Sequence, residues 1–352
     1  MFNLRRLAYY IILFVFTYLI FIYPFEVLNN LLYKEPVFKI SSVFFTSIFY
    51  TLIIFFFKTS NKSFWLKPLI YEGMGIGFIS FWIVNIGLII DFFTLNSDSL
   101  VIGKFCILSI FIIVFFSLIN ARFIKLKKIE ISSNKIKKRI KLIFISDTHL
   151  GSNSKKHLEK IYLKIKDLDF DILLIGGDFI DSSNFDLKDL DILKDIRKPI
   201  LFVSGNHEFY LKDHQKKFRE LEEFGFKFLD NKSYIYKNIN FIGISDRETI
   251  KTQKKIAKNL IQADIFNLVL IHKPSLWNLI DDNVDLMLSG HTHNGQIFPF
   301  NFLVKLQFKH IYGVYKRFDS MLYVSSGSGC WGPKMRFGTK NEIVEIFIRK
   351  NE

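Results

Sequence analysis

The chain has 352 residues, half of them hydrophobic, with 41 phenylalanines and only 7 prolines. This aromatic content is too high for an ordinary soluble domain. The formal net charge of +15 suits an anionic partner such as a phosphate substrate, an anionic lipid surface or nucleic acid. The two cysteines, Cys106 and Cys330, fall in different parts of the chain, which argues against an intramolecular disulfide and agrees with a reducing cytoplasm.

The first third of the chain predicts a membrane region with four spans. Residues 1–121 contain four long apolar runs, each of about the length that crosses ~30 Å of hydrocarbon as a helix. The predicted spans are about residues 7–25, 40–57, 73–90 and 100–121. A signal peptide is the alternative for the first run, but no cleavage site with small residues follows it and three further spans do.

Basic residues alternate between the loops and predict the orientation of the spans. They are in excess at the N-terminus, in the loop after the second span and in the segment that begins at Arg122. The loop after the first span balances Glu26 and Glu35 against Lys34 and Lys39. We therefore expect a multi-pass protein of the inner (cell) membrane, with both termini and residues 122–352 on the cytoplasmic side.

From residue 122 onward the composition is that of a soluble domain that is long enough to bury a core. Short apolar runs, rich in Ile, Leu, Phe and Val, alternate with helix-like segments such as Lys155–Leu168 and Asp213–Phe224. This alternation predicts an α/β fold. In such sheets functional sites gather at the carboxyl ends of the strands.

Five of these apolar runs end in a turn that carries His, Asp or Asn. The runs are KLIFISDTH, FDILLIGGD, PILFVSGNHE, FNLVLIHKP and VDLMLSGHTH, and the turn residues are Asp147, His149, Asp178, Asn206, His207, His272, His291 and His293. Carboxylate, imidazole and amide oxygen ligands suit divalent ions such as Mn, Fe or Zn. The set is too large for one tetrahedral site, so two metal ions that share a bridging carboxylate are predicted. The alternative is that these are ordinary turn residues without a metal. In that case five separate turns would each carry a possible metal ligand by chance.

The ordered string DTH…GD…GNHE…H…GHTH resembles the signature of the calcineurin-like metallophosphoesterases. The later stretches GHTHNGQIF and SSGSGCWGPKMRFGTKNEIVEI resemble the bacterial membrane-tethered branch of that family, with Asn294 where the branch often has glycine. The resemblance implies a double β-sheet sandwich flanked by helices. We expect this metallophosphoesterase domain over residues 122–352, after a four-helix transmembrane region over residues 1–121.

The resemblance also implies a role for each motif residue. One divalent ion would be bound by Asp147, His149 and His293. The other would be bound by Asn206, His272 and His291. Asp178 would bridge the two ions, and His207 would be the catalytic residue that protonates the leaving oxygen or stabilises the phosphoryl charge. Asp181 and Glu208 are expected to orient ligands, with solvated loop charges as the alternative.

The implied reaction is hydrolysis of a phosphodiester or pyrophosphate bond by a metal-activated hydroxide. Only about 25 residues separate the last span from Asp147, and part of that link, KKIEISSNKIKKRIKL, predicts a hairpin of the soluble domain. The site would then stay near the membrane, where basic residues are drawn to anionic head groups. The apolar stretch at residues 298–308 would be either a wall for an acyl chain or part of the core.

These features favour a lipid-linked substrate and a role in lipid metabolism. An example is UDP-2,3-diacylglucosamine, whose pyrophosphate relatives of this kind cleave in lipid A synthesis. One alternative is a phosphodiesterase, phosphatase or nuclease that acts on a soluble substrate. We do not expect a nucleic-acid partner, because no aromatic–basic stacking pattern is present. The other alternative is a non-catalytic metal-binding sensor or scaffold, against which the complete ligand set argues.

Overall fold

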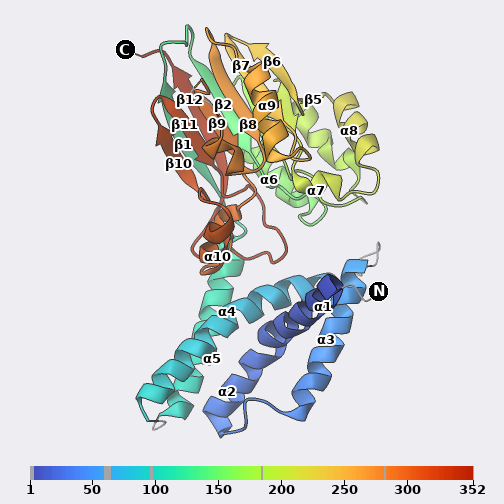
Figure 1. The fold of residues 1–352 in the computed structure, drawn as a ribbon, viewed down its shortest axis with the longest axis vertical. Helices are drawn as coiled ribbons and strands as arrows, with labels where there is room; N and C mark the ends of the chain where they lie inside the picture. Colours follow the sequence, from blue (N-terminus) through green and yellow to red (C-terminus); the bar gives the residue numbers. More distant parts are fainter. Residues whose placement is uncertain (1–3, 59–64, 96–97, 184, 281–282, 352) are drawn as a thin grey trace. The chain divides into compact units, whose positions relative to one another are not determined.

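The computed structural model describes residues 4–58, 65–95, 98–183, 185–280 and 283–351. The loop at residues 59–64, whose Lys62 contributes to the predicted orientation, lies outside the described residues. The chain forms two compact units (Figure 1). One comprises residues 1–119 together with 332–337, and the other comprises residues 120–331 together with 338–352.

The first unit is helical. Its elements are α1 (Leu4–Thr17), the π-helical turn η1 (Tyr18–Ile22), α2 (Tyr23–Tyr33), α3 (Ile40–Lys58), α4 (Leu66–Phe93) and α5 (Ser99–Asn120). Among the described residues, four helices are long and apolar enough to cross a membrane: Arg5–Tyr33, Ile40–Lys58, Leu66–Phe93 and Ser99–Asn120. Each of the four predicted spans falls on one of these helices. The second and fourth agree with their helices to within a residue at each end, whereas the helices at the first and third spans extend well beyond the predicted 7–25 and 73–90.

The first of these helices is longer than its apolar run. The sequence pattern places Glu26 in a loop after the first span, but the structure places it inside α2, where it is buried. That expectation was therefore wrong. A prediction from hydropathy ends the span at the first charged side chain. The helix itself continues, because α2 packs against α4 and the carboxylate of Glu26 accepts hydrogen bonds from Tyr18 and Ser42.

Two glycines of α4 accommodate the π-helical turn. Pro24 has no N–H to donate to the carbonyl of Ile20, four residues earlier. A Cβ at Gly77 would lie 2.1 Å from the oxygen of Ile20, and a Cβ at Gly73 would lie 2.8 Å from Cε1 of Phe21. The absence of side chains at these two positions lets η1 approach the backbone of α4 closely, as small residues do between membrane helices.

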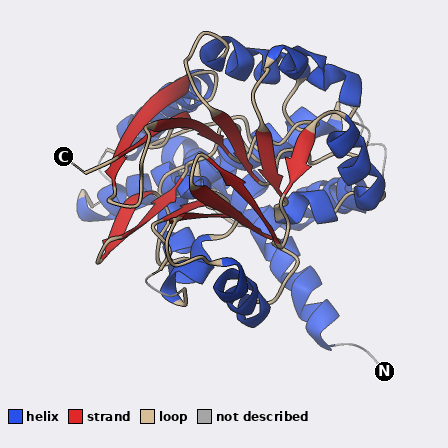
Figure 2. Ribbon diagram, turned by 90° about the horizontal axis from the view of Figure 1, so that it is seen from above, coloured by secondary structure: helices blue, strands red, loops and turns tan. Residues whose placement is uncertain are grey.

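The second unit contains two six-stranded sheets that form two layers (Figure 2). The order in the first sheet is β1 (Ile124–Ser132), β12 (Asn341–Arg349), β2 (Ile140–Ile145), β3 (Ile172–Gly176), β4 (Ile200–Val203), β5 (Phe226–Phe228). The order in the second sheet is β10 (Gly313–Arg317), β11 (Ser320–Val324), β9 (Leu286–Ser289), β8 (Phe266–Ile271), β7 (Ile239–Ile244), β6 (Lys232–Tyr236). Strands β2 to β5 are parallel, as are β7, β8, β9 and β11.

One core lies between the sheets and another covers each outer face. Phe144 and Leu174 from the first sheet share the central core with Phe241 and Leu268 from the second. The outer cores also involve the flanking helices α6 (Lys155–Ile165), α8 (His214–Glu223) and α9 (Ile250–Leu260), and the 3₁₀ helices η2 (Leu187–Asp195) and η3 (Pro274–Asn278). The expected double-sheet α/β sandwich flanked by helices is therefore confirmed.

The link after the last membrane helix does not form the predicted hairpin. Strands β1 and β2 both belong to the soluble unit, but β12 lies between them, parallel to β1 and antiparallel to β2. The physical reason is burial. Strand β12 is almost wholly buried, whereas β1 alternates between buried and exposed residues, as suits the sheet edge. The C-terminal strand therefore takes the central position.

Gly77→Ala should destabilise the helical unit, because the added Cβ would lie 2.1 Å from the backbone oxygen of Ile20. Gly73→Ala is the matched control, since its Cβ would meet only the ring edge of Phe21, which can rotate away. We expect the Gly77 variant to lose about 1–3 kcal/mol of unfolding free energy relative to this control. Thermal unfolding in detergent micelles measures the difference, and equal unfolding temperatures would contradict the packing described.

Candidate metal centre

The predicted site residues converge because five strands end at the same edge of the sandwich. Strands β2, β3 and β4 of the first sheet and β8 and β9 of the second are each followed directly by one of the predicted turns. The helix α7 (Asn206–Phe209) and the 3₁₀ turn η4 (His293–Gly295) begin within these turns. Because parallel strands in a sheet point their carboxyl ends to one side, motifs far apart in sequence meet in space.

One group of donors joins the first motif to the last. The Nε2 atoms of His149 and His293 are 3.2 Å apart, and Nε2 of His293 lies 3.5 Å from Oδ1 of Asp147. All three side chains are buried, and their potential ligand atoms lie within 4.8 Å of one another. This spacing is compatible with a single ion bound by the three residues.

A second group of donors lies beside the first. Nε2 of His272 is 3.1 Å from Oδ2 of Asp178 and 3.1 Å from Nδ1 of His291. The same Oδ2 of Asp178 lies 3.9 Å from Nε2 of His149, which belongs to the first group. The carboxylate of Asp178 therefore lies between the two groups.

Asn206, at the turn after β4, offers one further buried donor atom. Its Oδ1 is buried and has no hydrogen-bond partner among the described residues, while its Nδ2 lies 3.4 Å from the hydroxyl of Tyr210. A buried amide oxygen without a partner is costly, and a cation ligated by it would remove that cost. The donor set of carboxylates, imidazoles and one free amide oxygen thus fits divalent cations.

The buried charges shift the titration of the ligand candidates in opposite directions. Burial disfavours charge on Asp178, but His272 and His149 hold the pKa of its carboxyl well below the usual range. Burial opposes protonation of His272 too, yet Asp178 raises the pKa of His272 to about 10. Burial and the neighbouring His272 lower the pKa of His291 to about 2. Without a bound cation, Asp178 therefore favours a proton on His272, which His272 would have to release in order to ligate a cation, whereas His291 is already a neutral imidazole.

Glu208 orders the backbone around Asp178. Its buried carboxylate accepts the backbone N–H groups of Asp178 at 3.0 Å, Phe179 at 2.6 Å, Ile180 at 2.9 Å and Gly205 at 2.7 Å. Burial and the nearby Asp178 raise the pKa of Glu208 to about 7. The alternative of a solvated loop charge is therefore wrong for Glu208, since its side chain ties together the turns after β3 and β4.

Asp181 also supports a ligand candidate. Its Oδ2 lies 3.4 Å from Nδ1 of His149, and its Oδ1 accepts the backbone N–H of Ser152 at 2.7 Å. A carboxylate at the far ring nitrogen fixes the orientation and tautomer of a ligating histidine. Asp181 is thus placed to hold Nε2 of His149 toward the other donors.

The turns are built from backbone conformations that ordinary residues rarely adopt. Asp147, His149, Asp178, His291 and His293 all have left-handed φ, between 48° and 71°. Such strain is characteristic of functional sites, where the surrounding structure imposes it. Two glycines make the close approach possible: a Cβ at Gly290 would lie 2.2 Å from Oδ2 of Asp147, and one at Gly205 would lie 2.2 Å from Oδ1 of Asp178.

His207 lies at the edge of the cluster. Its ring centroid is 4.7 Å from that of His149, and its backbone N–H donates to Oδ1 of Asp178 at 2.8 Å. Burial lowers the pKa of His207 to about 4, so the ring is neutral at pH 7. The side chain of His207 is 18% exposed, and its Nε2 lies 3.9 Å from Oδ2 of Asp178. His207 can therefore contact a molecule that is bound next to the donor groups.

Trp331 is a site residue that sequence reasoning missed. Its ring lies 5.9 Å from that of His207 and is 47% exposed. The backbone of Trp331 is held by Gln296, which donates to its carbonyl at 2.9 Å and accepts its N–H at 3.0 Å. The signal was present in the GHTHNGQ motif, whose Gln296 stands three residues after His293 and is not one of the ligand candidates.

Comparison with known proteins agrees with this geometry. The family model described as calcineurin-like phosphoesterase matches residues 140–295. An uncharacterized metallophosphoesterase of Campylobacter jejuni is 33% identical over 258 residues, which cover 69% of this chain and 68% of that protein. An uncharacterized metallophosphoesterase of Helicobacter pylori is 34% identical, with 65% of each chain covered. A Danio rerio transmembrane protein with metallophosphoesterase domain is 28% identical, with 60% of this chain and 53% of that protein covered.

The chain therefore belongs to the calcineurin-like metallophosphoesterases, which are metal-dependent phosphoester hydrolases. The matches span about two thirds of the length of the two bacterial relatives. Together with the four long apolar helices, the similarity to a transmembrane protein indicates that the chain associates with membranes.

Proposed function

We propose that the protein is a membrane-anchored phosphoesterase that binds two divalent ions, with Mn, Fe or Zn as the expected metals. The observation that carries this proposal is the position of Asp178 between two groups of donors. In the first group are Asp147, His149 and His293. In the second group are Asn206, His272 and His291. Asp178 would ligate both ions.

The protein side chains have separate tasks in this proposal. Bound divalent ions would lower the pKa of water and offset charge on phosphoryl oxygens. His207 would contact the phosphoryl group, either donating a hydrogen bond from its neutral ring or, once a bound anion has raised its pKa, passing a proton to the leaving oxygen. Trp331 would cover one side of the bound group, next to His207.

Asp178→Asn and His207→Asn should fail in different ways. Asp178 would ligate both ions, so its variant should lose metal as well as turnover. His207 would not ligate, so its variant should keep both ions and lose turnover by something on the order of 10²–10⁴-fold. Elemental analysis of the purified variants, together with rates on a chromogenic phosphodiester, measures both effects.

Metal loss in the His207 variant, or full occupancy in the Asp178 variant, would mean that the roles are wrongly assigned. No metal-dependent turnover in the unaltered protein would favour the sensor or scaffold alternative.

We also propose that residues 1–121 form the membrane region and residues 122–352 the catalytic domain, which faces the cytoplasm from the inner membrane. The alternation of basic residues between the loops supports this orientation. A C-terminal fusion should then be active with a cytoplasmic reporter and inactive with a periplasmic one. The reverse pattern would overturn the orientation and with it the compartment of the site.

The helix α10 (Phe300–Gln307) supports a lipid-linked substrate. One side of it packs on the turn of the metal centre: a Cβ at Gly295 would lie 2.4 Å from Cα of Asn301, and the ring of Phe308 lies 5.1 Å from that of His291. The opposite side carries Phe302, Leu303 and Leu306, which are 56%, 52% and 84% exposed. The helix has no buried residue, so the core alternative is wrong for α10, although Phe308, which follows it, is buried.

An exposed apolar helix side that is fixed to a metal-binding turn is suited to contact an acyl chain. We therefore propose that the substrate is a phosphodiester or pyrophosphate with a lipid tail, such as UDP-2,3-diacylglucosamine. The charged part would bind at the metal centre, and the tail would run along α10. Exposed Lys305 on this helix would favour an anionic substrate or membrane surface.

An acylated substrate should be hydrolysed with a far higher kcat/KM than its deacylated form. Burial of only four methylenes gives roughly a hundredfold preference. Leu306→Glu should reduce this preference without changing the rate on a soluble phosphodiester. Leu163→Glu, on α6 and 58% exposed, is the control because it lies on a different exposed helix.

Equal values of kcat/KM for the acylated and deacylated forms of the substrate would contradict the proposal of a lipid-linked substrate. A preference for cyclic nucleotides or oligonucleotides would instead support the alternative of a soluble substrate. Neither result would affect the assignment to the metallophosphoesterases.

A further inference from the structure

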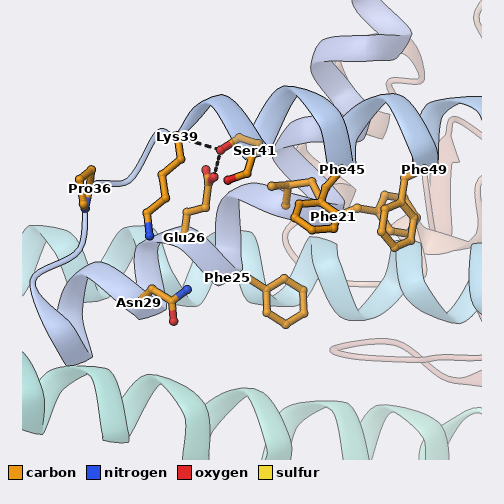
Figure 3. Close-up of a pocket in the computed structure, with 11 residues that line it drawn as sticks. Phe21, Phe25, Glu26, Asn29, Pro36, Lys39, Ser41, Phe45 and Phe49 are labelled. Carbon is orange, nitrogen blue, oxygen red and sulfur yellow. Dashed lines mark hydrogen bonds between the residues drawn. The ribbon is translucent and has the colours of Figure 1, made fainter.

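The helical unit contains a cavity of about 420 Å³ between the second half of the first membrane helix and α3. Figure 3 shows that its lining changes character from one end to the other. Lys39, Glu26 and Asn29 lie at the polar end, and the rings of Phe21, Phe45 and Phe49 lie at the apolar end. A cavity of this kind matches an amphiphile, with a head group at one end and a hydrocarbon chain at the other.

Glu26 is the central polar group of the cavity. Its carboxylate is buried and accepts hydrogen bonds from the hydroxyl of Tyr18, at 2.9 Å, and from the hydroxyl of Ser42. An ionised carboxylate offers about four acceptor positions, so these two bonds leave capacity for a further donor. An ionisable side chain inside a membrane helix is costly to bury, and such residues commonly mark functional sites.

The backbone directs Glu26 toward the cavity. The π-helical turn η1 inserts an extra residue into the helix just before Pro24, and the glycines of α4 hold that turn in place. Such turns are frequent at functional sites because they rotate the following side chains relative to a regular helix. Here the residues that follow include Phe25, Glu26 and Asn29, all of which line the cavity.

Lys39 supplies the positive charge at the polar end. Its ammonium forms an ion pair with Glu35 at 2.8 Å, in which both side chains are substantially exposed, at 39% and 51%. Exposed pairs of this kind contribute little stability, so a phosphate group could replace Glu35 at small cost. The cavity thus combines an acceptor for an ammonium with a donor for a phosphate.

We propose that this cavity binds one phospholipid whose head group carries both an ammonium and a phosphate. The ammonium donates to Glu26, the phosphate pairs with Lys39, and one acyl chain lies against Phe21, Phe45 and Phe49. The helical unit is then a lipid-binding module as well as an anchor. This inference is independent of the catalytic activity proposed above, because every residue in it belongs to the helical unit.

The test uses the full-length protein in nanodiscs that contain phosphatidylethanolamine and phosphatidylglycerol in equal amounts. After transfer to detergent, native mass spectrometry counts the lipids retained by each chain. We expect one retained phosphatidylethanolamine and little phosphatidylglycerol. Glu26→Gln should lower the ratio of the two retained lipids roughly tenfold, the effect of losing one charge-assisted hydrogen bond.

A second pair of variants keeps the test decisive if Glu26→Gln does not fold. Phe45→Trp enlarges a side chain that lines the cavity and should reduce retention of both lipids. Phe44→Trp is its matched control, since Phe44 is 63% exposed and is absent from the lining.

Unfolding temperatures of all variants show that the unit is intact. No retained lipid, an unchanged ratio in Glu26→Gln, or equal retention by the Phe44 and Phe45 variants would overturn the proposal. Selective retention of phosphatidylglycerol would also overturn it, because the carboxylate of Glu26 should then repel the head group.

Discussion

The buried carboxylate of Asp178 imposes the strongest physical constraint on the soluble unit. A charge that is removed from water must be compensated by nearby opposite charge and by hydrogen bonds, or it shifts its pKa and becomes neutral. His272 at 3.1 Å and the backbone N–H of His207 at 2.8 Å supply part of that compensation. Divalent cations bound by the surrounding donors would supply the rest, so the arrangement of turns around Asp178 and its metal-binding chemistry have the same cause.

A second buried carboxylate, that of Glu208, makes the first one possible. It accepts four backbone N–H groups from the turns after β3 and β4 and so holds both turns in one conformation. Those turns contain left-handed residues and closely approaching glycines that would otherwise be unfavourable. The strain of the site is therefore sustained by interactions that lie outside the ligand set, in agreement with the way metal sites are generally supported.

In the helical unit, too, an irregular backbone positions a buried carboxylate, here that of Glu26 among apolar helices. Pro24 interrupts the regular hydrogen bonding of the first membrane helix, and Gly77 provides the space in which the resulting π-helical turn packs. The irregular backbone then presents Glu26 to Tyr18 and Ser42 instead of to lipid. In both units, polar chemistry is located where the backbone departs from regular geometry and where a glycine accepts the close contact.

Local patterns in the sequence were sufficient to predict the four apolar helices, the α/β class, and the strands that carry His, Asp and Asn at their ends. Such patterns are local because hydropathy, periodicity and ligand type are properties of a few neighbouring residues. The same patterns also predicted the candidate ligands, because the carboxyl ends of parallel strands lie at one edge of a sheet. These candidates are Asp147, His149, Asp178, Asn206, His272, His291 and His293. The individual role of each ligand stays a prediction.

Only the tertiary structure decided features that depend on residues far apart in the chain. Strand β12 lies between β1 and β2 because this position buries its apolar side chains. It thereby pairs Lys125 of β1 with Glu342 of β12. Trp331 came to lie beside His207 through its hydrogen bonds with Gln296. Segment 332–337 joined the helical unit, where Met335 packs against Gly75. None of these contacts has a local signature, because the free energy that selects each one arises only when the separate segments pack together.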